Sequence, residues 1–131
     1  MTFPIDQLRA AEQALSHAEG PFRLFAVVLR SGAPDRWDVL VSAPWIEADK
    51  GAALQAITAE LQRRLDRQDL VRLSAVVTID PERASLARIG REFNVEHGAR
   101  EIYRREFLGR EISRGVVITA KAPGVSAAAR F

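Results

Sequence analysis

The residues best suited to bind a ligand or a partner lie in an arginine-rich segment near the C-terminus. Between residues 97 and 114 this segment carries His97, Arg100, Tyr103, Arg104, Arg105, Arg110 and Arg114. Arginine beside aromatic side chains is suited to contacts with phosphates or bases. Glu101, Glu106 and Glu111 offset three of the five arginine charges, however, and each would repel a nucleic-acid backbone. The segment therefore favours a charged edge strand or a face that meets a protein partner over nucleic-acid binding, with a site for a small anionic ligand as the alternative.

Metal and cofactor chemistry has little support in the sequence. The chain has no cysteine, and its two histidines, His17 and His97, are far apart along it. Glu96 and His97 supply two ligands, whereas a protein zinc site takes three or four. The glycine patterns of phosphate loops and dinucleotide-binding turns do not occur. We therefore expect no metal and no bound cofactor.

No local motif indicates an enzyme. The serines lie outside any nucleophile-elbow pattern. The segment around Lys50 lacks the acid-x-lysine motif of one class of metal-dependent nuclease, because the residue two before the lysine is Ala48. Asp80 follows an expected strand, where α/β proteins often place functional groups, but capping of the next helix explains this residue equally well.

Trp45 is a second candidate contact for a partner. It follows Pro44 at the end of an expected strand, and tryptophan is enriched among the dominant residues of protein interfaces. The alternative is that its indole packs under the helix that follows. Trp37 lies on an apolar alternation instead and is expected in the core.

Hydrophobic periodicity defines the elements that must position these residues. Helices are expected from Pro4 to the stop at Gly20-Pro21, from about Ala48, and from Asp80-Pro81-Glu82, whose three residues each suit a helix start. Strands are expected over 22–30, 36–43, 71–79, 100–108 and 115–120. The 100–108 segment also fits a helix, because Tyr103 and Phe107 are spaced i,i+4.

These elements predict a fold class. The turn at residues 31–35 is too short for a crossover, so the strands on either side of it must pair antiparallel. The strands at 22–30 and 71–79 carry apolar residues on both faces, so we expect both to be covered on both sides. We predict an α/β fold, with α+β as a variant. It would be a single-layer mixed sheet of about five strands with helices packed on its faces, in the order α-β-β-α-β-α-β-β.

Length and composition predict one domain over 1–122, followed by a flexible tail at 123–131. The chain shows neither a signal peptide nor an apolar run of membrane-spanning length, so a cytoplasmic location and no membrane partner are expected. Arginine makes up 17 of the 19 basic residues, a bias common in GC-rich bacterial genomes. The net charge of +2 is small for a nucleic-acid-binding protein.

Two classes of function remain. The favoured one is a small non-catalytic binding or assembly module that acts through self-association, as a homodimer, or through a protein partner. The alternative is a small enzyme or ligand-binding domain whose residues converge on an anionic ligand only in three dimensions. A concave pocket that gathers His97, an arginine and an acid would favour the alternative, whereas a flat, paired sheet edge would favour assembly.

Overall fold

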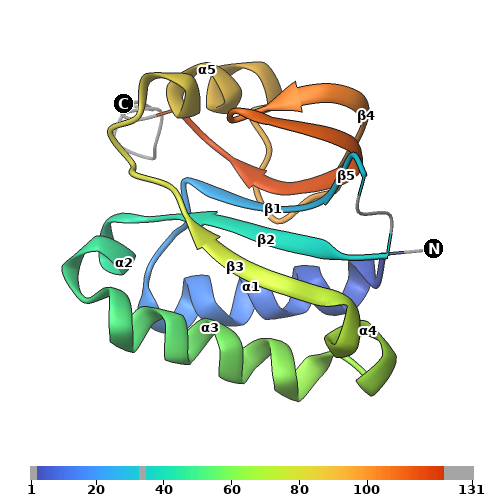
Figure 1. The fold of residues 1–131 in the computed structure, drawn as a ribbon. Coiled ribbons are helices and arrows are strands. Elements are labelled where there is room, and N and C mark those ends of the chain that lie inside the picture. Colours follow the sequence, from blue (N-terminus) through green and yellow to red (C-terminus); the bar gives the residue numbers. More distant parts are fainter. Residues whose placement is uncertain (1–2, 33–34, 123–131) are drawn as a thin grey trace.

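The chain forms one mixed sheet with helices on both faces (Figure 1). The computed structural model describes residues 3–32 and 35–122, so the tail expected at 123–131 lies outside the described residues. The strands are β1 (Leu24–Arg30), β2 (Trp37–Ser42), β3 (Leu73–Thr78), β4 (Arg100–Phe107) and β5 (Arg110–Ala120). The helices are α1 (Ile5–Glu19), α2 (Pro44–Ala48), α3 (Lys50–Arg64), α4 (Arg67–Arg72) and α5 (Ala84–Phe93). None of the helices within these ranges is long and apolar enough to cross a membrane.

The strand order is β3-β2-β1-β5-β4, which leaves β3 and β4 at the two edges. β1 pairs antiparallel with both β2 and β5, and β4 pairs antiparallel with β5. β2 and β3 run parallel, because α2, α3 and α4 carry the chain back to the end of the sheet at which β2 begins. The predicted α/β fold, its mixed five-stranded sheet and its hairpin of β1 and β2 are confirmed.

Two hydrophobic clusters cover the two faces of the sheet. Phe25 and Val27 of β1 pack with residues of α1 and α3, and Ala26 and Val28 pack with α5 on the opposite face. The central strand β1 is therefore buried on both sides, as its run of apolar residues predicts. Trp37 is fully buried in the cluster beneath α1 and α3, which confirms its expected place in the core.

The expectation that residues 71–79 form a strand buried on both faces is wrong. Residues 67–72 form α4, and β3 is an edge strand whose residues are exposed or only partly buried. The apolar alternation predicts the wrong face for the start of this strand, because Ser74 is an extra residue in the register between β2 and β3. Leu73 and Val76 consequently pack on the same face.

The helix expected to start at Asp80 begins later. Residues 80–83 form a turn in which the Asp80 carboxylate accepts a hydrogen bond from the N–H of Glu82, and α5 starts at Ala84. The helix continues through Gly90 and ends at Asn94, which has the left-handed conformation of a C-cap (φ 43°). The helix expected from about Ala48 is α3, which starts at Lys50 and is preceded by the short helix α2.

The segment that fitted either a strand or a helix is a strand. Phe107 faces Arg110 across the hairpin of β4 and β5. The two residues between them, Leu108 (φ 52°) and Gly109 (φ 83°), both have positive φ, as a type I′ turn requires. β4 therefore lies at the edge of the sheet, as the alternation of charged and aromatic residues predicts.

Candidate interaction surfaces

The arginines of the C-terminal segment are largely occupied by contacts within the protein. Arg105 forms a bidentate ion pair with Glu92 of α5, at 2.7 and 3.2 Å, and lies over the rings of Phe93 and Phe107. The hydrogen bond from Arg105 holds the pKa of Glu92 below its ordinary value. Arg100 donates to the carbonyl of Phe93 and also lies over that ring. These two arginines therefore bind α5 to the edge strand.

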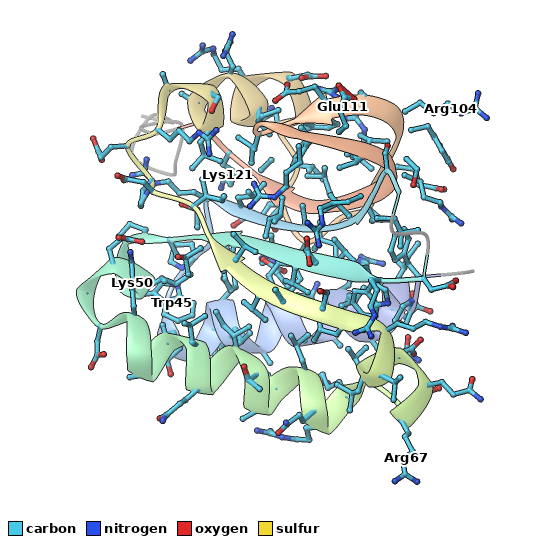
Figure 2. All side chains as sticks on the ribbon, in the orientation of Figure 1. Trp45, Lys50, Arg67, Arg104, Glu111 and Lys121 are labelled. Carbon is cyan, nitrogen blue, oxygen red and sulfur yellow. The ribbon has the colours of Figure 1, made fainter. Side chains whose placement is uncertain are left out.

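Two other residues of the segment are exposed. The hydroxyl of Tyr103, a residue that is 57% exposed, hydrogen-bonds to Glu101, and this bond raises the tyrosine pKa. Arg104 projects away from the body of the protein (Figure 2). Its left-handed backbone (φ 46°) interrupts the regular edge of β4. An irregular, charged edge resists the addition of another strand.

Arg110 and His97 complete the predicted set, and neither joins the others. Arg110 donates to the carbonyl of Leu108 in the hairpin turn. His97 lies at the other end of the hairpin, in the loop before β4, and contacts α1. The structure thus spreads these residues along an edge and does not gather them in one pocket.

His97 belongs to a buried polar cluster that the sequence analysis missed. Its Nδ1 lies 2.5 Å from Oε1 of Glu12, a residue of α1 that is fully buried. The hydroxyl of Thr119 donates to Oε2 of Glu12 at 2.8 Å and accepts from the backbone N–H of His97 at 3.1 Å. Arg9 donates to the carbonyl of His97. The signal in the sequence was a glutamate on the apolar stripe of α1, four residues after Leu8.

A histidine oriented by a buried carboxyl group is one half of many catalytic arrangements. The other ring nitrogen of His97, Nε2, lies 3.8 Å from Oε2 of Glu96. Across the residues that the structure describes, no three histidine, cysteine or acidic side chains come together as metal ligands. The cluster ties α1 to β5 and to the loop before β4.

Three hollows contain arginine, and in each of them the arginines lie beside acids. In a hollow of about 360 Å³ between α1 and α3, Arg63 and Arg64 lie near Asp6 and are both ion-paired with Glu60. A groove of about 190 Å³ lies between α5 and the β4–β5 hairpin, with Arg88 and Arg105 opposed by Glu92 and Glu106. A shallow depression of about 360 Å³ beyond the ends of β2 and β3 has one arginine, Arg23, and three acids, which are Glu47, Asp80 and Glu82. In none of the three hollows do the arginines outnumber the adjacent acids, so none has the excess of positive charge that would favour an anionic ligand.

Trp45, a residue of α2, packs against the segment before β1. Its ring meets that of Phe22 edge to face, with centroids 5.3 Å apart, and a side chain at Gly20 would lie 3.0 Å from the indole. The indole is half-buried in this position, labelled in Figure 2. This packing accounts for Trp45 without a partner.

The open edge at β3 is the surface that the sequence analysis overlooked. No charged residue occurs between Leu73 and Ile79, and Ser74 and Ala75 are exposed. The N–H of Ile79 donates to Val41 of β2, and residues of a strand point their peptide groups alternately to the two sides. The peptide groups of Val76 and Thr78 therefore point to the open side. β3 therefore lacks the charged side chains of β4, and from Ala75 to Thr78 it pairs residue for residue with β2.

Comparisons with known proteins add no family to this picture. No protein-family model matches the chain, and neither a curated protein nor a solved structure matches it.

Proposed function

We propose that this chain is a non-catalytic assembly module that self-associates by joining the β3 edges of two copies into one continuous sheet. The observation that carries the proposal is the contrast between the two edges of the sheet. β4 is charged and irregular at Arg104, whereas β3 is uncharged and offers peptide groups on its outer side. Strand addition at such an edge is a recurrent mode of protein recognition.

The state of the polar side chains also supports assembly over chemistry. Arg105 is paired with Glu92, and His97 with Glu12. In the three hollows of the described surface that contain arginine, the arginines do not outnumber the adjacent acids, which disfavours the anionic ligand that the alternative function requires. A binding function through the sheet edge needs no convergent set of side chains, because main-chain hydrogen bonds supply the affinity.

Sedimentation equilibrium over a range of concentrations tests this proposal. We expect wild-type protein to form a dimer, and Ala75→Lys to shift it toward monomer, because lysine on an edge strand opposes pairing. The matched control is Tyr103→Lys, which adds the same charge to the other edge and should leave the dimer unchanged. A wild-type protein that stays monomeric at every concentration, or equal loss of dimer in both variants, would contradict the proposal.

A further inference from the structure

We infer that an uncharged flank of α3 forms the second part of the self-association interface and packs against the same flank of a second copy. This inference rests on the proposed self-association through β3 and adds a helix contact to it. The surface concerned, the α3 flank, surrounds a shallow hollow of about 310 Å³ and is lined by Leu54, Gln55, Thr58, Ala59 and Gln62.

The α3 flank carries no charge, although it belongs to an exposed helix. The residues of α3 between Lys50 and Glu60 are all uncharged. Arg63 and Arg64 lie toward α1, with which they share a hollow. On the opposite face of the sheet, α5 presents three charged residues to solvent within its ten residues, which are Arg88, Arg91 and Glu92. Depletion of charge is typical of the centre of a protein interface.

The position of α3 places this flank next to the open edge at β3. α3 lies on the chain between β2 and β3, and Leu73 and Val76 of β3 pack against the cluster that α3 shares with β2 (Figure 1). α1 packs beside α3 and contacts β5, which lies farther from β3 in the strand order. The flank of α3 turned away from α1 is therefore the flank on the β3 side.

Pairing of the β3 edges alone gives a small interface. A strand of six residues is about 20 Å long and a sheet is about 10 Å thick, so each edge offers on the order of 200 Å². Stable interfaces bury about 800 Å² on each partner. Most of the contact must therefore come from elements beside β3, and on one face of the sheet that element is α3.

Two identical strand edges can be joined symmetrically in two ways. An antiparallel pair has its two-fold axis normal to the sheet, so α3 of both copies lies on the same face. A parallel pair has its axis along the strands, so the two α3 helices lie on opposite faces. Because α3 lies over β2 and β3, the antiparallel arrangement sets the two helices about two strand spacings apart, or about 10 Å. Helices pack at about 8–10 Å, so this arrangement brings the two α3 flanks into contact.

A carboxylate on the α3 flank tests the helix contact. We expect Thr58→Glu to weaken dimerisation about tenfold or more in sedimentation equilibrium, because the two-fold axis brings like charges onto facing helices. Glutamate is the better helix former, so loss of the dimer would not reflect loss of the helix. The control is Gln13→Glu on the exposed side of α1, which should leave the dissociation constant unchanged.

The outcomes for the helix contact and for the strand edge are distinguishable. Dissociation of the dimer by Ala75→Lys but not by Thr58→Glu would overturn the α3 contact and leave the β3 edge in place. A wild-type protein that stays monomeric at every concentration would overturn both.

Cross-linking distinguishes the two symmetric arrangements. The chain has no cysteine, so Gln55→Cys, Thr58→Cys and Gln62→Cys each introduce one thiol per copy. A short bifunctional thiol reagent should link at least one of these variants into a covalent dimer, and should not link the control Gln13→Cys. In the parallel arrangement the sheet would separate the thiols. Failure of all three variants to cross-link at concentrations where they sediment as dimers would overturn the inference.

Discussion

The pairing of His97 with the fully buried Glu12 gives the sharpest prediction for stability. Truncation in His97→Ala removes the contact at 2.5 Å and leaves the carboxyl group of Glu12 with only the Thr119 hydroxyl. Glu12→Gln instead keeps the size of the side chain and its hydrogen-bonding capacity while removing the charge. The two variants therefore separate the loss of a partner from the loss of a charge.

The expected cost follows from burial. Leaving a buried polar group without its hydrogen-bond partner costs about 1–3 kcal/mol, and the His97 side chain is 34% exposed, so water can replace part of it in the variant. We expect His97→Ala to lower the free energy of unfolding by about 2 kcal/mol and Glu12→Gln to lower it by about 1 kcal/mol. The double variant should cost only about 1.5 kcal/mol, because a buried amide loses less than a buried carboxyl group when its partner is removed.

Urea unfolding, followed by tryptophan fluorescence and circular dichroism at neutral pH, measures these differences. His17→Ala is the matched control, because His17 is exposed on α1, the helix that carries Glu12. This substitution should change stability by less than about 0.5 kcal/mol. The reasoning would be refuted by additive costs in the double variant, or by a cost for His97→Ala no larger than that for His17→Ala.

Two further predictions concern α5. Arg105→Gln should cost about 0.5 kcal/mol near pH 7, because the ion pair with Glu92 is partly exposed. The lowered pKa of Glu92 contributes stability above its unfolded pKa, and this stability is lost as pH falls. Between about pH 5 and 3, the free energy of unfolding should therefore depend less on pH in the variant than in wild type. Gly90→Ala should cost about 1–3 kcal/mol in thermal or urea unfolding, because its Cβ would lie 2.4 Å from the backbone of residues 121–122. Gly51→Ala has only an ordinary contact and should be neutral or slightly stabilising.

Much of the fold follows from local signals in the sequence. The apolar run of β1 and the short turn after it fix a central antiparallel hairpin, and the charged alternation of residues 100–107 predicts an edge strand. The end of the sheet at β3 could not be predicted in this way. The extra residue at Ser74 moves the side chains before it in β3 to the opposite face of the sheet from the one that alternation predicts. The hydrophobic pattern of the sequence does not reveal a register shift of this kind.

The candidate surfaces were less predictable than the fold. Arginines that suggest a binding site in the sequence form contacts within the protein instead, such as the ion pair of Arg105 with Glu92. The spacing of residues along the chain does not reveal such a pair. Glu12 and Thr119 are 107 residues apart and meet only because α1 packs against the end of β5. The uncharged sequence of β3 marks an open edge only once the strand order places β3 at the end of the sheet. The strand order depends on contacts between residues far apart in the sequence, so it could not be predicted from local patterns.

Amide hydrogen exchange at Val76 and Thr78 tests the central claim most directly. Their N–H groups point to the open side of β3, so each should exchange rapidly in the monomer. We predict that both become protected as the protein concentration rises and the dimer forms, while the exposed amides of β4 keep their exchange rates. Rapid exchange of Val76 and Thr78 at concentrations where the protein sediments as a dimer would contradict assembly through this edge.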